Sequence, residues 1–358
     1  MQTRLQAIVG ATAVVGADLD RVADAAVVLE GETISAAGDA SDVEVADAAE
    51  VFDGRGLTLV PGFIDTHVHI GFYRPSDLLA GGVTTVRDLG SPEAEIFPLA
   101  SRSRRDGFDG PRVLAAGPIL TAPGGYPTRA AWAPPGTGRE VADATQARSA
   151  VVDLAAAGAV VVKVALNPPV GPTLDLATLT AIVDEAHEHG LTVTAHVHDL
   201  AELDKALRAG IDELAHMLLS NEPLPDGTIE RMVDASVTVV PTLAIFSGEP
   251  LATAVANLSA FLAAGGRVVY GTDLGNEGPR PGIDPLEVTA MARAGMSCLE
   301  IVRSATVDAA RHLGLETTGA IEAGHDADVV LVEGDPLNVA ADLTRVRAVW
   351  RRGRLRAS

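Results

Sequence analysis

The chain contains a single cysteine, Cys298, so no disulfide can form within it. Aromatic residues make up only 3% of the chain, whereas Gly and Ala are abundant, and such small side chains suit helices packed closely on a sheet. The first ten residues lack the basic stretch and apolar core of a signal peptide, and no apolar run is long enough for a transmembrane helix. We therefore expect a cytoplasmic protein.

Positive charge is also scarce, because 27 Lys and Arg residues face 48 Asp and Glu residues, which gives a net charge of −21. Such a surface repels a phosphate backbone and an anionic membrane. We therefore expect neither nucleic acid nor membranes as partners, and we interpret the acidity as a means of staying soluble. Lysine is the rarest cationic residue, since it occurs only at Lys163 and Lys205.

The middle of the chain alternates short Val/Ile/Leu-rich runs with Ala/Leu/Glu-rich segments of helical period. Eight such runs alternating with helices predict an α/β fold in which a parallel sheet closes into a (β/α)₈ TIM barrel. The predicted strands are 59–65, 83–88, 112–120, 160–166, 191–196, 211–216, 237–243 and 267–273. The predicted helices include 142–157, 175–189 and 200–209, each followed by a glycine as a stop signal, and a last helix near 300–313.

Both ends of the chain instead have short alternating β patterns. We expect them to form one small β-sandwich, which divides the chain into 1–58 and 314–358 (sandwich) and 59–313 (barrel). The stretch 117–138 is rich in Pro and Gly and predicts a long loop over the barrel mouth.

Six side chains of metal-ligand type fall at or near the C-terminal ends of the predicted strands, which converge on the catalytic face of such a barrel. Their combination of rings, amine and carboxylate predicts a metal site, with zinc as the expected metal. These residues are His67, His69, Lys163, His196, His216 and Asp273.

Lys163 is the most informative of the six, because it lies within a run that should be buried (160–166) in a chain that otherwise avoids lysine. A buried ammonium loses its proton readily. The neutral amine can react with CO₂ to give a carbamate, an anion able to bridge two cations. A lysine paired with a carboxylate is the alternative. Lys205, in a helical segment, is expected to be solvated.

Other histidines are weaker candidates. His187 and His189 are also two residues apart, but they end a helical segment, where side chains at that spacing point to different sides. We expect His312 and His325 to be surface or interdomain residues. His198 shares a face with His196 and is a candidate for contact with substrate.

The motifs resemble those of the amidohydrolase superfamily over nearly the whole chain. The segment 61–69 (PGFIDTHVH) is similar to that family's first-strand motif, 194–217 to its fifth and sixth strands, and 271–273 (GTD) to its eighth strand. The C-terminal segment 319–336 resembles its returning sandwich strand. Lys163 places the chain nearest the binuclear subgroup with a carboxylated lysine, including the metal-dependent Xaa-Pro dipeptidases and imidazolonepropionase-related members. Tyr126 stands where those dipeptidases often have a loop histidine.

The resemblance implies two divalent metal ions, most simply Zn²⁺, and N6-carboxylation of Lys163 by CO₂. A hydroxide bridging the ions would cleave a C–N bond of an amide, a peptide or a cyclic amide, with Asp273 as general acid and base. Tyr126 or His198 would hydrogen-bond the developing oxyanion.

Two alternatives remain open from sequence alone. The same scaffold can act as a lactonase, a phosphotriesterase or a ring deaminase, since fold does not settle chemistry. A non-enzymatic scaffold protein is the other alternative, although it predicts lost ligands and all six are present. We expect a small-molecule substrate, and the sequence leaves a homo-oligomer open.

Overall fold

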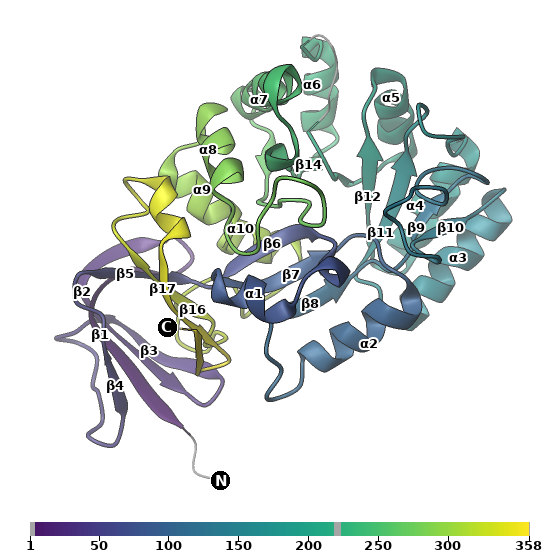
Figure 1. Cartoon of the computed structure of the whole chain (residues 1–358). Helices are drawn as coiled ribbons and strands as arrows, with labels where there is room; N and C mark the ends of the chain where they lie inside the picture. The colour runs from purple at the N-terminus through teal and green to yellow at the C-terminus, as the bar shows by residue number, and fades with distance from the viewer. Residues whose placement is uncertain (1–3, 218–222, 358) are drawn as a thin grey trace.

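The computed structural model describes residues 4–217 and 223–357. It consists of a β-sheet layer built from both ends of the chain and a barrel of parallel strands surrounded by helices (Figure 1). None of the helices in the described ranges is long and apolar enough to cross a membrane.

The sheet layer interleaves the two chain ends, with strand order β18-β17-β16-β5-β1-β2-β3 and β4 paired to β1. Its strands are β1 (Leu5–Val15), β2 (Asp20–Glu30), β3 (Thr33–Asp39), β4 (Glu50–Asp53), β5 (Leu57–Pro61), β16 (Val329–Glu333), β17 (Val346–Arg351) and β18 (Arg354–Ala357). The antiparallel pairing of β5 with β16 joins the two ends. The core of this layer holds Trp350, whose ring meets that of Phe52 edge to face at 5.0 Å.

The barrel strands are parallel and occur in two ladders. One ladder contains β6 (Phe63–Val68), β7 (Val83–Asp88) and β8 (Arg112–Ala115). The other contains β10 (Gly138–Glu140), β9 (Ile119–Thr121), β11 (Val161–Leu166), β12 (Thr192–Val197), β13 (Glu213–Leu214), β14 (Thr238–Val239) and β15 (Arg267–Val268).

Backbone hydrogen bonds connect the two ladders at both seams. At one seam, the N–H of Val160 donates to the carbonyl of Ala115, between β8 and β11. At the other seam, Thr66 donates to Tyr270 and Asp273 donates to His67, between β6 and the segment after β15. These bonds continue the ring of strands, as the sequence predicted.

Ten α-helices occur in the described ranges, and those of the barrel lie outside the strands (Figure 1). They are α1 (Pro75–Ala80), α2 (Glu93–Ser103), α3 (Ala144–Ala157), α4 (Leu176–Glu188), α5 (Leu200–Ala209), α6 (Asp226–Asp234), α7 (Gly248–Ala263), α8 (Pro285–Arg293), α9 (Cys298–Ser304) and α10 (Val307–His312). Three short 3₁₀ turns are η1 (Ile70–Phe72), η2 (Leu243–Ile245) and η3 (Ala340–Thr344).

Helix α3 shows how local sequence sets these limits. The Asp143 side chain accepts hydrogen bonds from the N–H groups of Thr145 and Gln146 and so caps the first turn. Gly158 ends the helix with φ of 97°, a left-handed conformation that side chains other than glycine rarely adopt. The predicted limits of this helix are therefore correct to within two residues.

The first predicted barrel strand, 59–65, is wrong, because the chain changes sheets at Gly62. β5 pairs in the sheet layer built from the two chain ends and straddles the predicted boundary between 58 and 59, while β6 enters the barrel. A Cβ atom on Gly62 would lie 2.2 Å from Oγ1 of Thr84, so only glycine permits this close passage.

Two other predicted elements are also divided. The predicted strand 112–120 forms β8 and β9, so the predicted loop 117–138 contains a short strand at its start. The predicted last helix forms α9 and α10, because the carbonyls of Ser304 and Ala305 accept hydrogen bonds from the barrel amides of Tyr270 and Ile64. A carbonyl that accepts a hydrogen bond from the barrel in this way is not available for the hydrogen bonds that would continue the helix.

Candidate active site

The six predicted ligand residues line one cavity of about 240 Å³. His67 and His196 lie in β6 and β12, and Lys163 lies in β11. His69 directly follows β6, whereas His216 and Asp273 lie two and five residues after the ends of β13 and β15. The complete lining is His67, His69, Ile119, Tyr126, Trp132, Lys163, Asn167, His196, His198, His216, Ile245, Asp273 and Asn276.

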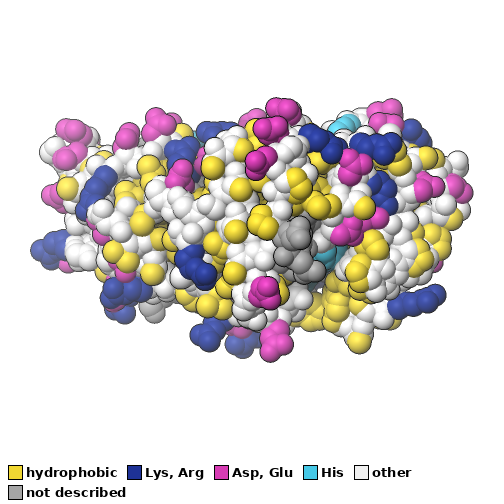
Figure 2. Space-filling view, turned by 90° about the horizontal axis from the view of Figure 1, so that it is seen from above, with side chains coloured by type: hydrophobic (Ala, Val, Ile, Leu, Met, Phe, Trp, Pro, Cys, Tyr) yellow, Lys and Arg dark blue, Asp and Glu magenta, His cyan; other side chains and the backbone are white. Residues whose placement is uncertain are grey.

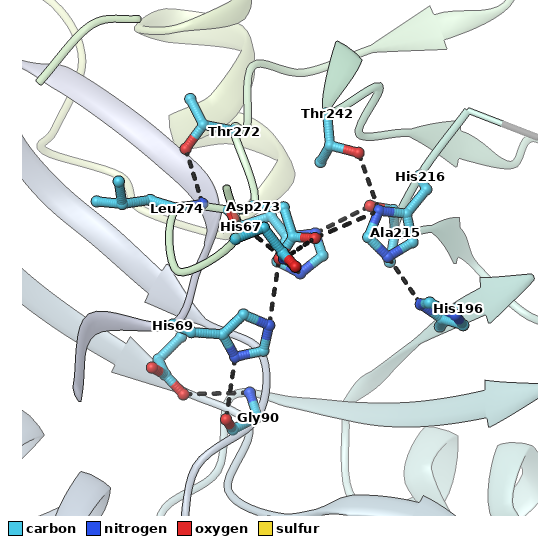
Figure 3. A network of polar contacts seen from close by, with 12 residues as sticks. His67, His69, Gly90, His196, Ala215, His216, Thr242, Thr272, Asp273 and Leu274 are labelled. Atoms are coloured by element: carbon cyan, nitrogen blue, oxygen red, sulfur yellow. Dashed lines mark hydrogen bonds and ion pairs between the residues drawn. The ribbon is translucent and has the colours of Figure 1, made fainter. Parts of the chain in front are cut away.

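His67, His69 and Asp273 form the tighter cluster, with one ligand atom from each residue within 4.8 Å of the others. The Nε2 atoms of both rings lie 3.2 Å from Oδ1 of Asp273 (Figure 3). Each ring turns its Nδ1 atom to a backbone carbonyl, that of Ala215 at 2.9 Å for His67 and that of Gly90 at 3.0 Å for His69. Because Nδ1–H donates there, the Nε2 lone pairs remain for a cation.

Asp65 holds the two strands that carry this cluster in register. Its carboxylate accepts hydrogen bonds from the N–H of His67 at 3.1 Å, and from the N–H and the hydroxyl of Thr272 at 3.1 and 2.6 Å. Asp273 follows Thr272 directly and has a φ of 56°, which is uncommon for a residue with a side chain. These contacts fix the backbone on which the Asp273 carboxylate depends.

His196 and His216 form a second pair of ligand atoms. Nδ1 of His196 lies 2.9 Å from Nε2 of His216, and Nδ1 of His216 lies 2.9 Å from the hydroxyl of Thr242 (Figure 3). Nε2 of His196 meets the side-chain amide of Asn167 at 3.1 Å. The amide atom nearest that nitrogen is Nδ2, which donates to it; a 180° turn of the amide would instead let the Asn167 oxygen accept Nε2–H and leave the Nδ1 lone pair of His196 for a cation.

The two clusters are adjacent. Oδ2 of Asp273 lies 3.9 Å from Nδ1 of His216, and the rings of His67 and His216 are 4.9 Å apart. Burial lowers the pKa values of His67, His196 and His216 well below the usual range, and neighbouring cationic groups lower them further. Neutral imidazole is the form that binds a metal.

Lys163 lies in the same cavity and is 2% exposed. Its Nζ atom is buried and has no hydrogen-bond partner among the described residues. Burial lowers the pKa of Lys163 to about 7, and Arg87 adds to this shift, while Asp273 and Glu213 oppose it. An unpartnered buried amine beside neutral histidines and a carboxylate fits a site for divalent cations better than it fits a closed polar core.

Beneath this site lies a buried ionic network that the sequence did not predict. Arg87 donates to both oxygens of Glu213 at 2.7 and 2.8 Å, and Nε of Arg87 donates to the carbonyl of Thr66 at 2.7 Å. His312, whose side chain is 14% exposed, contacts the same carboxylate through Nε2. The sequence did contain a signal for this pair, because Arg87 and Glu213 each place a charge within a predicted barrel strand.

The predicted substrate residues Tyr126 and His198 both line the cavity. The Tyr126 ring stacks on His196 with centroids 5.0 Å apart. Burial raises the pKa of Tyr126 to about 12, with a contribution from Asp273, so its hydroxyl keeps its proton at neutral pH. The His198 ring lies 4.4 Å from that of His196, and its Nδ1 is buried without a hydrogen-bond partner among the described residues.

Among the polar and aromatic lining residues, sequence reasoning missed three, Asn167, Trp132 and Asn276. Nδ2 of Asn276 donates to Oδ2 of Asp273 at 2.7 Å. These residues lie on loops, where no periodicity indicates the direction of a side chain.

Lys205, predicted to be solvated, instead lies mostly covered and pairs with Glu202 at 2.7 Å.

Comparison with known proteins shows the family of the chain. The model of the amidohydrolase family matches residues 58–356, which is most of the chain. The chain belongs to the amidohydrolase family. The resemblance seen in the sequence is thereby confirmed, and with it the assignment of the chain as a hydrolase of a metal-dependent enzyme family.

Two relatives are similar to this chain over most of their length. An uncharacterized protein of Mycobacterium tuberculosis is 29% identical over 88% of this chain and 90% of its own length. An enamidase of Eubacterium barkeri is 27% identical over 88% of this chain and 83% of its own length. In fold, the chain resembles the structure of an Xaa-Pro dipeptidase with a TM-score of 0.84, at 22% identity over 98% of this chain and 99% of that one.

Proposed function

We propose that this amidohydrolase cleaves a C–N bond of an amide, a peptide or a cyclic amide in a small molecule, using two divalent cations. The observation that supports this most directly is the meeting, in one cavity, of two sets of ligand nitrogens and the unpartnered Nζ of Lys163. Zinc is the expected metal because imidazole and carboxylate ligands dominate.

Each residue would have a defined place at such a centre. His67, His69 and Asp273 would hold one ion, and His196 and His216 the other. Lys163 would bridge the ions as a carbamate. When bound, the two cations would lower the pKa of a water molecule and polarise the carbonyl of the substrate.

Carbamate formation follows from the state of Lys163. Its neutral amine attacks the carbon of CO₂, an N–C bond forms as one C–O π bond opens, and a proton leaves to solvent. The product carries a negative charge on two oxygens. The pKa of about 7, set mainly by burial, makes the neutral amine available near neutral pH.

Proton transfer would be the task of Asp273. Its carboxylate accepts a proton from the attacking water and delivers it to the leaving nitrogen, so that the amine departs neutral. Asn276 orients this carboxylate through the 2.7 Å bond to Oδ2. The Tyr126 hydroxyl would donate a hydrogen bond to the oxygen on which negative charge develops.

The two lysines of the chain make a matched experiment. Lys163→Arg and Lys205→Arg each keep a positive charge, but a guanidinium does not form this carbamate. With ¹³C-labelled bicarbonate and zinc, we expect one carbamate resonance in the native protein and in Lys205→Arg, and none in Lys163→Arg. Loss of metal and of amide hydrolysis should accompany the missing resonance.

A substrate panel of N-acyl amines, dipeptides, a lactone and a phosphotriester tests the bond cleaved. Turnover of the lactone or the phosphotriester alone would overturn the proposal of C–N hydrolysis. A cytoplasmic location and a homo-oligomer remain predictions for fractionation and light scattering.

A further inference from the structure

Two aromatic side chains, Tyr126 and Trp132, line the metal cavity, and Phe72 contacts Trp132 beside it, although aromatic residues make up only 3% of the chain. Trp132 is the centre of the group. Its ring lies 5.4 Å from His69, 6.0 Å from Tyr126 and 6.3 Å from Phe72, measured between centroids. We call Phe72, Tyr126 and Trp132 the aromatic wall.

The aromatic wall is partly open to solvent. Trp132 is 37% exposed and Phe72 is 47% exposed, which places both among the most exposed large apolar residues described. Figure 2 shows a hollow in which histidine surface is visible beside hydrophobic side chains. Exposed aromatic rings at the edge of a polar cavity are available for a ligand to cover.

Cationic side chains are scarce among the cavity residues that the structure describes. Among the described lining residues there is no arginine, and the only lysine is Lys163, whose amine is buried. Residues 218–222, outside the described ranges, include neither Lys nor Arg in their sequence. The remaining polar groups, such as the amides of Asn167 and Asn276, are neutral.

A substrate with a free carboxylate would therefore lose hydration without gaining a cationic partner outside the centre itself. The net charge of −21 adds a long-range repulsion against anions. The cavity of about 240 Å³ is smaller than the roughly 300–1,000 Å³ usual for drug-sized ligands. It suits one ring and one amide rather than a long peptide.

We propose that the substrate is a small uncharged aromatic amide whose ring stacks on Trp132, within the aromatic wall, while its amide faces the ligand cluster. This inference rests on the proposed function for the cleaved bond. The ring supplies stacking and apolar burial, and the absence of a cation selects against free amino-acid carboxylates.

Three primary amides test this proposal, since all release ammonia. They are benzamide, cyclohexanecarboxamide and 4-carbamoylbenzoate, which differ in ring flatness and in charge. We expect calorimetry on the zinc-loaded protein to give benzamide an affinity up to about tenfold higher than that of the cyclohexane analogue. The carboxylated analogue should bind at least about tenfold more weakly than benzamide.

Variants of Trp132 give the second arm. Trp132→Ala should lower the affinity for benzamide about tenfold and remove the preference for benzamide over cyclohexanecarboxamide. Trp132→Phe should retain most of the affinity and most of the preference. Leu286→Ala serves as the control, because Leu286 is 55% exposed and lies outside the cavity. Thermal unfolding curves establish that each variant is folded.

Tryptophan fluorescence gives an independent reading. The only other tryptophan, Trp350, is buried in the core of the sheet layer, so a change in fluorescence on adding benzamide reports on Trp132. Equal affinity for benzamide in Trp132→Ala, or tighter binding of the carboxylated probe, would overturn the inference. Stacking without ammonia release would count against the proposed function instead, and ammonia release without ring preference would count against this inference alone.

Discussion

His196 and His216 direct imidazole nitrogens at each other, with Nδ1 of the first 2.9 Å from Nε2 of the second. The rings come from neighbouring parts of the barrel, since β12 pairs in parallel with β13. Burial keeps both neutral by lowering their pKa values. Two neutral rings converging in this way would hold the second cation of the proposed centre, apart from the His67–His69–Asp273 cluster.

The first prediction concerns metal content. His216→Gln should reduce the zinc bound by the protein from two ions to one, because it removes a ligand of one cluster only. Elemental analysis after dialysis measures the stoichiometry. His187→Gln is the matched control, since His187 is exposed and pairs with Asp212. Two ions retained in His216→Gln would contradict the assignment.

The second prediction concerns the stability of the metal-free protein. The pKa of Lys163 is about 7 in the folded chain against 10.5 for an ordinary lysine. The unfolded chain therefore binds more protons between these values, so this group costs stability, fully below pH 7 and not at all above about pH 10.5. Lys163→Met should stabilise the metal-free protein by on the order of 4 kcal/mol at pH 6.

Denaturant unfolding of metal-free protein across this pH range measures the effect. The gain from Lys163→Met should shrink as pH rises from 7 to 10.5, and the variant should bind no second metal ion. Lys205→Met, whose lysine pairs with Glu202, serves as the comparison. A loss of stability in Lys163→Met at pH 6 would contradict the account.

The third prediction concerns the buried pair beneath the site. Burial alone would raise the pKa of Glu213, but Arg87 and His312 lower it to about 2. Its contribution to stability is therefore present above pH 4.5 and is lost as pH falls towards 2. Glu213→Gln should lower the free energy of unfolding by roughly 3–5 kcal/mol at pH 7, since it leaves Arg87 buried and unpaired.

Asp153→Asn is the surface counterpart, because Asp153 is exposed and pairs with the partly exposed Arg139. We expect it to cost less than about 1 kcal/mol. The difference in free energy of unfolding between Glu213→Gln and the native protein should also become smaller below pH 4.5. A difference that stays constant down to pH 2.5 would show that the ion pair is not its source.

The fourth prediction concerns Tyr126. Tyr126→Phe keeps the ring that stacks on His196 but removes the hydroxyl. If the hydroxyl donates to the developing oxyanion, kcat should fall by about 100-fold with little change in KM. Zinc content should stay unchanged. Tyr73→Phe is the control, and an unaltered kcat in Tyr126→Phe would remove this role.

The sequence predicted the features of the site that depend on strand order. Residues far apart in sequence, such as His67 and Asp273, could be placed together because the C-terminal ends of parallel barrel strands meet on one face. The eight-strand pattern predicted the closed ring for the same reason. The division at Gly62 escaped prediction because apolar residues continue on both sides of it.

Other features depend on contacts that no local pattern encodes. Arg87 and Glu213 pair across 126 positions of sequence, which requires the register of the barrel. Trp132 lies in a segment rich in Pro and Gly, where side-chain direction follows from loop conformation rather than from period. The aromatic wall, and with it the inferred substrate class, therefore became visible only in three dimensions.

The central claim is that two cations bind at the two histidine clusters and are bridged through Lys163. Anomalous X-ray scattering at the zinc edge from crystals of the active, zinc-loaded protein tests it most directly. We predict two peaks, one against Nε2 of His67 and His69 and one between Nδ1 of His196 and Nε2 of His216, with electron density extending from Nζ of Lys163. An active protein with no anomalous peak at these nitrogens would contradict the account.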